Sequence, residues 1–198
     1  MSENQQASDG TRRPCVALLA DFKEEGWPSM DRVAESIYRE LRAMGAEFDV
    51  ELIRPRMLRL FSRLPFLGRL GAAFNTDRLF NRLIVYPFKL RKIRKQYDLF
   101  HLVDHSYSQL IHVLDPRRVL VTCHDLDTFR CLLDPSNFPA GRAFRKMTRH
   151  ILTGFQKAER VTCDSQSTMD DILQHELMPQ KKLSICRMGV NPVFFKAS

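Results

Sequence analysis

The chain has 198 residues, 44% of them hydrophobic and 27% charged, which supplies enough apolar material for a core and excludes a disordered chain or a small disulfide scaffold. No apolar run reaches the roughly 20 residues that a membrane-spanning helix needs, and the polar N-terminus lacks the apolar stretch of a secretory signal. The five cysteines are scattered and form no C-x-x-C pair, so we expect a reducing cytoplasm. The length favours one domain, which we place over 14–198 after a disordered tail over 1–13.

The net charge of +8 is concentrated in one segment. Residues 54–95 contain twelve lysines or arginines and one acid, Asp77, while the rest of the chain carries slightly more acids than bases. We therefore expect a basic insert over about 54–96 in an otherwise mildly acidic protein. A compact basic surface attracts anionic membranes, nucleic acids or phosphorylated ligands.

The start of the domain predicts a strand, a helix and a second strand. Residues 14–20 are a continuous apolar run, which is typical of a strand buried on both faces. A helix is expected from Ser29, as its N-cap, to Gly45, because apolar residues recur between them at helical spacing. Residues 48–53 predict the second strand, which completes a βαβ unit with a right-handed crossover.

The basic insert predicts two helices. Apolar residues from Met57 to Leu64 recur at helical spacing, and a second helix is expected to begin at Thr76. The side chains expected on its inward face are Leu79, Phe80, Leu83 and Ile84. Pro87 should kink or end this helix, because proline lacks the backbone N–H and clashes with the preceding turn.

Strands and helices alternate from Tyr97 onward. The expected strands cover 98–103, 118–123, 160–163 and 182–186, and the expected helices cover 106–114, 141–158 and 165–175, with a long loop over 124–139. This alternation predicts an α/β fold, a single Rossmann-like, doubly wound and mostly parallel sheet that carries the basic amphipathic helical insert. Ligands of such sheets bind where loops leave the carboxyl ends of the strands.

Polar residues follow four of the expected strands at that edge. They are Gly26, Trp27 and Ser29 after the first strand, Asp104 and His105 after the third, His124, Asp125 and Asp127 after the fourth, and Asp164 and Ser165 after the fifth. Because the carboxyl ends of parallel strands meet at one edge of the sheet, we expect these loops to converge on one crevice.

The loop at Gly26 leads into the helix expected at Ser29. Its backbone N–H groups and the positive end of the helix can receive a phosphate or a sugar oxygen. The loop is not G-x-G-x-x-G, so a dinucleotide fingerprint is absent. The alternative is a glycine that only turns the chain.

The histidines and carboxylates at the strand ends also suggest a metal site. His105, His124, Asp125 and Asp127 would hold a divalent ion that activates water in a hydrolase. Their spacing matches no tight ligand motif, so we predict no bound metal. His124 is the better candidate for hydrogen bonding a ligand or stabilising charge, with capping of the loop backbone as its alternative role.

The basic insert suits an anionic surface. Its apolar side chains would dip toward acyl chains while its arginines meet headgroups; the alternative is an ordinary surface helix whose apolar face lies on the sheet. Nucleic acid is not an expected partner, because stacking aromatic positions and nucleic-acid motifs are missing. The residues predicted to contact a membrane or another anion are Arg56, Arg59, Arg63, Arg69, Arg91, Lys92, Arg94 and Lys95.

Several motifs occur in an informative order. After the first strand and its glycine loop come the segments Tyr97 to His101, Val121 to Asp125, Ala158 to Thr168 and Lys182 to Phe194. In this order and spacing, over about 14–195, the chain resembles the N-terminal domain of retaining GT-B glycosyltransferases of the family-4 type. Its Met188-Gly-Val-Asn191 is similar to the Asn-Gly-Val-Asp signature of that family.

This resemblance implies two Rossmann-like domains that face each other across a cleft. The N-terminal domain would hold mainly the acceptor and the C-terminal domain the nucleotide-sugar, with no further cofactor. Gly26 and its neighbours would lie near the donor diphosphate, although the usual paired glycines are replaced by Gly26-Trp27. His124 would lie beside the transferred sugar and stabilise the transition state, and we expect His124 and Asp125 to be the catalytic residues.

The expected function is the acceptor-binding half of a glycosyltransferase that moves a sugar from a nucleotide-sugar to an acceptor, lipid-linked or near a membrane. The C-terminal donor-binding domain is absent from these residues, so we expect this chain alone to be catalytically incomplete or to act with a separate donor-binding domain. The expected location is the cytoplasm, at the inner face of a membrane. The alternatives are a non-catalytic module that binds anionic membranes and a metal-dependent hydrolase.

Overall fold

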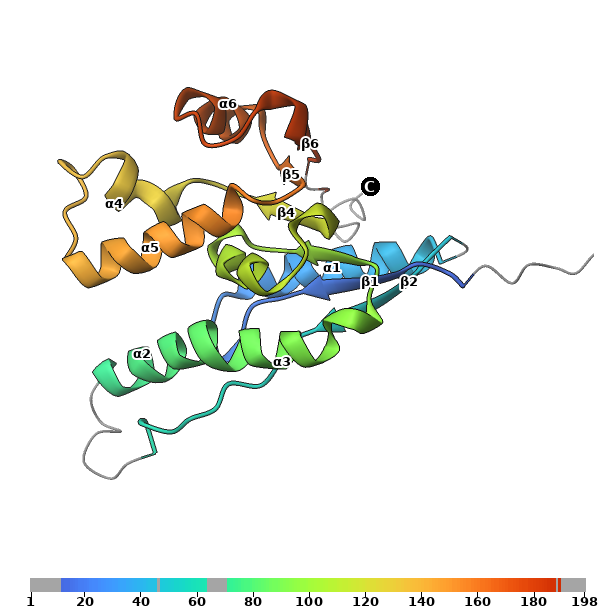
Figure 1. The fold of residues 1–198 in the computed structure, drawn as a ribbon, viewed down its shortest axis with the longest axis horizontal. Helices are drawn as coiled ribbons and strands as arrows, with labels where there is room; N and C mark the ends of the chain where they lie inside the picture. The colour runs from blue at the N-terminus through green and yellow to red at the C-terminus, as the bar shows by residue number, and fades with distance from the viewer. Residues whose placement is uncertain (1–11, 46, 64–70, 188, 190–198) are drawn as a thin grey trace, which may run out of the picture.

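The sheet is the centre of the structure, a computed structural model that describes residues 12–45, 47–63, 71–187 and 189. Its strands are β1 (Cys15–Leu19), β2 (Asp49–Ile53), β3 (Leu99–Leu102), β4 (Val119–Cys123), β5 (Arg160–Cys163) and β6 (Leu183–Ile185). The six strands run in the order β2-β1-β3-β4-β5-β6, and every neighbouring pair is parallel. The predicted Rossmann-like α/β fold is confirmed, with a fully parallel sheet over the described residues (Figure 1).

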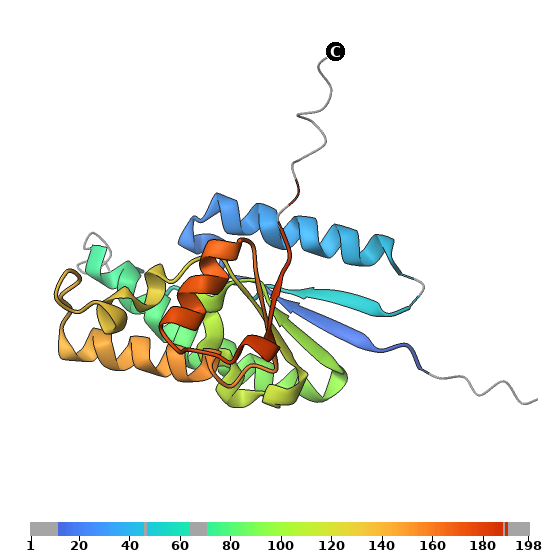
Figure 2. The same ribbon diagram turned by 90° about the horizontal axis from the view of Figure 1, so that it is seen from above.

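Helices cover both faces of the sheet. They are α1 (Pro28–Ala43), α2 (Gly71–Phe80), α3 (Tyr86–Ile93), α4 (Arg130–Leu133), α5 (Arg142–Phe155) and α6 (Gln166–Gln174), with a π-helical turn over Asn81–Val85 and a 3₁₀ helix over His105–Val113. Helix α1 lies on one side of the sheet, whereas α3, the 3₁₀ helix and α5 lie on the other (Figure 2). This arrangement is what parallel strands joined by right-handed crossovers require.

Each face of the sheet buries its own apolar cluster. Under α1, Ala34 packs with Leu18 of β1 in a small cluster. The opposite face holds the larger core, in which Phe100 of β3 and Val121 of β4 pack with Phe155 of α5. Period-two alternation along the strands therefore divides the core between the two helical layers.

The ends of α1 and α6 show one wrong and one correct capping prediction. Trp27 occupies the N-cap position of α1 and Pro28 its first turn, so Ser29 is not the cap. Proline is well suited to that position because its missing N–H has no intrahelical partner there. Ser165 caps α6 as predicted, with its Oγ accepting a hydrogen bond from the Thr168 backbone N–H.

The first helix predicted in the insert does not form over its described part. Residues 57–63 run as irregular chain, and Leu64 lies outside the described residues. The buried Asp77 carboxylate accepts hydrogen bonds from three backbone N–H groups, at positions 60, 61 and 62, and the Asn81 side chain bonds both the N–H and the carbonyl of Leu58. These side chains satisfy backbone groups that a helix would otherwise have paired.

The second helix of the insert is longer than predicted. It begins at Gly71 rather than Thr76, and it passes through Pro87 into α3 instead of ending there. The π turn precedes the proline, with the Tyr86 N–H bonding the Asn81 carbonyl. Pro87 therefore lies in the first turn of α3, directly after the π turn. In that position a helix tolerates a residue without a backbone N–H and has room for the proline ring.

The buried face of this helix also differs from the prediction. Asp77, Asn81 and Val85 are buried, whereas Leu79 is 37% and Ile84 is 56% exposed. The prediction that Leu79 and Ile84 point inward was wrong because the polar contacts of Asp77 and Asn81 hold a different face of the helix against the molecule.

The remaining differences are local. The helix predicted over 106–114 is the 3₁₀ helix, and the long loop predicted over 124–139 contains α4 and a 3₁₀ turn over Asp127–Phe129. At the end of the predicted tail, Arg12 forms an ion pair of 3.0 Å with Asp98. Residues 1–11 lie outside the described part of the chain.

Candidate functional site

A polar pocket of about 370 Å³ opens at the carboxyl ends of β1, β3 and β4. The predicted site residues that line it are Trp27, Ser29, Asp104, His105, His124, Asp125 and Asp127. The structure thus brings together, at one edge of the sheet, loops whose site residues are at least 19 positions apart in the sequence, as the fold predicts. The chemical roles of these residues stay predictions.

Three predicted residues do not line this pocket. Gly26 adopts a left-handed conformation, with φ at +71°, and closes the short helical turn after β1, so glycine is required there for its backbone. Asp164 lies beside the His124 ring, and Ser165 is occupied as the cap of α6.

His124 is held by contacts at both ring nitrogens. Its Nε2 donates to the Val103 carbonyl over 3.0 Å, and its Nδ1 lies 3.3 Å from Oδ2 of Asp164. The Val103 carbonyl can only accept a hydrogen bond, so Nε2 is the donor in that contact. The ring is therefore fixed at the wall of the pocket.

His105 lies between two carboxylates. Its Nδ1 is 3.3 Å from Asp104 and its Nε2 is 3.7 Å from Asp125, yet within the described chain neither nitrogen has a hydrogen-bond partner. Burial against Phe129 disfavours the charged ring and lowers the pKa of His105, although the two carboxylates oppose this effect. A buried imidazole with unused nitrogens is a candidate to bond a ligand.

Asp104, which lines the pocket, and the buried Asp21 beside it have pKa values shifted in opposite directions. Burial, together with the adjacent Asp104 carboxylate, raises the pKa of Asp21 to about 9. Burial also disfavours ionisation of Asp104, but His105 and the hydrogen bonds from Ser106 outweigh it and lower the pKa of Asp104. At neutral pH Asp104 is therefore the ionised member of this pair.

Arg78 and Arg82 are pocket residues that sequence reasoning missed as part of this site. They lie one turn apart at the end of α2 and in the π turn, and both line the polar pocket. Arg82 pairs with the buried Glu25 at 3.5 Å, donates to both oxygens of Ser106 and stacks over the Tyr107 ring. Both residues belong to the predicted basic insert, and their i, i+4 spacing is the feature of the sequence that could have shown that they lie on one face of a helix.

A family model described as Glycosyltransferase Family 4 matches residues 30–194, which is most of the chain. The chain belongs to glycosyltransferase family 4. The matched residues of this family-4 chain include His105, His124 and Asp125 but begin after Ser29, so the loop at Gly26 falls outside the match. No curated protein matches the sequence.

The predicted anion-binding residues of the family-4 chain divide into three groups. The exposed ones are Arg56, Arg59, Arg63, Arg91, Lys92 and Lys95. Arg94 is also exposed, but its guanidinium donates to the Val113 carbonyl over 2.6 Å, so it ties the end of α3 to the 3₁₀ helix. Arg69 lies outside the described residues. No helix in the described segments has the length and apolarity to cross a membrane.

The hydrolase alternative finds little support in the geometry of the family-4 chain. In the part of the chain that the structure describes, no group of three histidines, cysteines or acids is arranged to hold a metal ion. His124, the central ligand of that hypothesis, must donate its Nε2 proton to Val103 and so has no lone pair there for a metal.

Proposed function

We propose that this chain is the acceptor-binding half of a retaining, GT-B type glycosyltransferase, which transfers a sugar from a nucleotide-sugar to an acceptor. The observation that carries the proposal is the polar pocket at the carboxyl edge of the sheet, lined by His105, His124 and Asp125, in a chain of glycosyltransferase family 4. Sugars are recognised by such convergent carboxylates, imidazoles and exposed aromatic rings.

Asp125 is the group best placed to orient an acceptor hydroxyl. Its side chain is 55% exposed, and its Oδ1 accepts the backbone N–H of Asp127. Among the described residues no group donates a hydrogen bond to Oδ2, so this oxygen can accept one from a hydroxyl of the acceptor. His124 supports this arrangement, because its contacts with Val103 and Asp164 fix the loop that carries Asp125.

The donor is bound across the cleft by a second, donor-binding domain that faces this edge of the sheet. Trp27 and Ser29, which line the polar pocket, lie at the start of α1, and the positive end of that helix favours the donor diphosphate. The reaction needs no cofactor besides the nucleotide-sugar. Retention predicts that the product carries the same anomeric configuration as the donor, which NMR of the product reads directly.

Replacing His124 by alanine should lower kcat about 100-fold, because the loop that carries Asp125 loses the contacts of the ring with Val103 and Asp164, and a displacement of a reacting group by about 1 Å costs that factor. The measurement is transfer of radiolabelled sugar from a panel of nucleotide-sugars, catalysed by the product of the complete reading frame. His112→Ala is the matched control, since His112 stacks on His150 between the 3₁₀ helix and α5, away from the polar pocket. A His124→Ala variant with transfer within threefold of the wild type would contradict the proposal.

An anionic membrane is the partner that we propose for the insert. Leu58, Leu60 and Phe61 are between 36% and 49% exposed, and their loop is fastened to Asp77 and Asn81. On the neighbouring helix Ile84 and Phe88 are more than half exposed. Exposed apolar side chains among arginines and lysines are typical of proteins that bind the headgroup region of an anionic membrane. Such binding would place the enzyme at the cytoplasmic face of a membrane.

Charge reversal of Arg56, Arg59 and Arg63 to glutamate should abolish co-sedimentation with vesicles containing 30% phosphatidylserine, because each basic residue contributes about 1 kcal/mol near such a surface. The charge-matched control reverses Arg32, Arg39 and Arg42, which are exposed on α1 at the other face of the sheet. Equal loss in both variants would show attraction by net charge alone. Vesicle binding without any sugar transfer would favour the non-catalytic membrane module.

A further inference from the structure

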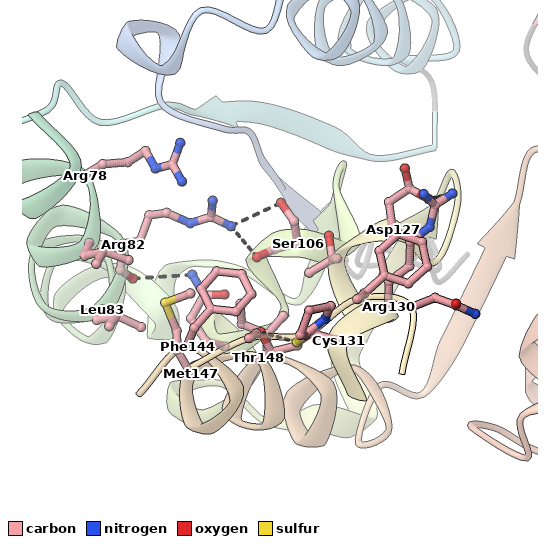
Figure 3. Close-up of a pocket in the computed structure, with 18 residues that line it drawn as sticks. Arg78, Arg82, Leu83, Ser106, Asp127, Arg130, Cys131, Phe144, Met147 and Thr148 are labelled. Carbon is pink, nitrogen blue, oxygen red and sulfur yellow. Dashed lines mark hydrogen bonds and ion pairs between the residues drawn. The ribbon is translucent and has the colours of Figure 1, made fainter. Parts of the chain in front are cut away.

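A larger hollow adjoins the polar pocket. It encloses about 580 Å³, and the residues that line both are Arg78, Arg82, Ser106, Asp127 and Thr128. The hollow lies between α2 with the π turn on one side and α5 with its preceding loop on the other (Figure 3). A ligand bound in the polar pocket can therefore extend directly into it.

The walls of this second hollow are mainly apolar. They are formed by Leu79 and Leu83 on one side, Phe144, Met147 and Ile151 of α5 on the other, and Phe138, Pro139 and Ala140 of the loop before α5. Phe138 is 40% and Phe144 is 52% exposed. Large apolar side chains held open to solvent around a hollow of this size are typical of a site for an apolar group.

The end nearest the polar pocket is cationic. Arg78 and Arg82 both extend toward the loop of Asp127 (Figure 3). Arg82 is neutralised by Glu25, and Asp127 by Arg130. Arg78 forms no ion pair within the described residues, and its Nε is buried without a hydrogen-bond partner. A buried guanidinium N–H that lacks an acceptor is costly, so this end of the hollow favours an anion.

We propose that the hollow binds an anionic amphiphile, with a phosphate or carboxylate at Arg78 and an alkyl or aryl group between α2 and α5. This inference rests on the proposed function: the amphiphile is the acceptor, and its anionic and apolar parts occupy the hollow without reacting. Its sugar-accepting hydroxyl then reaches the polar pocket beside Asp125. The apolar walls and the Arg78 guanidinium together select a ligand that is neither a free sugar nor a neutral lipid.

Direct binding tests the inference without any donor. Trp27 is the single tryptophan of the chain and lines the polar pocket, so its fluorescence reports ligands. The probes, used below their micellar concentrations, are decyl phosphate, decanoate, decyl glucoside and inorganic phosphate. We expect one or both anionic amphiphiles to bind at least about tenfold more tightly than decyl glucoside or inorganic phosphate, since a charge-assisted hydrogen bond contributes at least that factor. The two anionic probes distinguish phosphate from carboxylate.

Two variants locate the binding. Arg78→Gln should raise the Kd of the anionic probe about tenfold and leave that of decyl glucoside unchanged, whereas Arg39→Gln on the exposed side of α1 should change neither. Ala140→Phe, which fills the hollow, should weaken both alkyl probes. Equal affinity for neutral and anionic probes, or an Arg78→Gln variant with unchanged affinities, would overturn the inference.

The outcome separates this inference from the proposed function. If the anionic probe binds as described but the complete protein transfers no sugar, the proposed function fails and the ligand site stands. If sugar is transferred and Arg78→Gln leaves the Kd of the probe and the KM of the acceptor unchanged, the transferase stands and the amphiphile site fails.

Discussion

The Arg82→Gln variant should lose about 3–5 kcal/mol of folding free energy, the usual result of removing one partner of a buried ion pair. The side chain of Glu25 is 1% exposed, and its carboxylate is held by the Arg82 guanidinium at 3.5 Å and by the Tyr107 hydroxyl at 2.8 Å. Without Arg82 this carboxylate keeps one neutral donor and no compensating charge. Urea unfolding followed by circular dichroism measures the loss.

Two variants control this prediction. Arg78→Gln alters the same segment one turn earlier, where no ion pair of the described chain is broken, and should cost less than about 1 kcal/mol. The double variant Glu25→Gln/Arg82→Gln should recover most of the lost stability, because the Glu25 carboxylate is then no longer left buried without its partner charge. Additive losses in the double variant would mean that Arg82 stabilises the fold through Ser106 and Tyr107 alone.

The loss of folding stability in Arg82→Gln should depend on pH in a definite direction. Arg82 opposes the raised pKa of Asp21, which burial and Asp104 cause, and it helps to lower the pKa of Asp104. Its removal raises the pKa of both carboxyl groups in the folded protein. A further rise in the folded pKa of an acid costs stability only from the pH at which that acid ionises in the wild type, which is acid pH for Asp104 and about pH 9 for Asp21. The deficit of Arg82→Gln in urea unfolding should therefore be larger at pH 10 than at pH 8.

The Gly154→Ala variant should lose about 3 kcal/mol, which for a chain of this size lowers Tm by about 6–12 °C. Gly154 is the point at which α5 crosses the 3₁₀ helix. A Cβ built there would lie 2.0 Å from the Ser108 carbonyl oxygen and 2.7 Å from its carbon, both backbone atoms. Because backbone cannot rotate aside as a side chain does, the two helices must separate and open the core around Ile151 and Phe155.

Gly141→Ala is the matched control for this substitution. Gly141 precedes α5 with φ at −64°, and a Cβ there meets nothing within 4 Å, so alanine should leave Tm unchanged or raise it slightly. Calorimetry of the two variants beside the wild type provides the comparison. Equal Tm values for Gly154→Ala and Gly141→Ala would contradict the close crossing of α5 and the 3₁₀ helix.

Local sequence patterns were sufficient to predict the strands of the sheet and the edge of the sheet at which the candidate site lies. The apolar runs in β1 and β4 are local, and the caps and turns that separate strands from helices are read within a few residues. Parallel topology then fixes which strand ends meet, so the sequence predicts that His105, His124 and Asp125 lie at one pocket. The Gly26 loop was assigned to the same edge, but its glycine serves the left-handed turn after β1.

The insert was predicted least well, because its structure depends on distant polar partners. The apolar spacing from Met57 onward is that of a helix, yet the Asp77 carboxylate and the Asn81 amide satisfy that backbone from 15 to 23 residues away. The same anchoring turns Leu79 and Ile84 outward, and the π turn lets the helix pass Pro87. No periodicity encodes these contacts.

The sequence by itself determined the α/β class, the parallel sheet and the loops that meet at its carboxyl edge, because hydrophobic periodicity and crossover handedness act locally and uniformly. The tertiary structure alone decided which charges those loops meet. Arg82 reaches Glu25 across 57 residues and His124 reaches Asp164 across 40. Buried polar groups must find partners wherever the fold places them, and those partners set the charge and the shape of the candidate site.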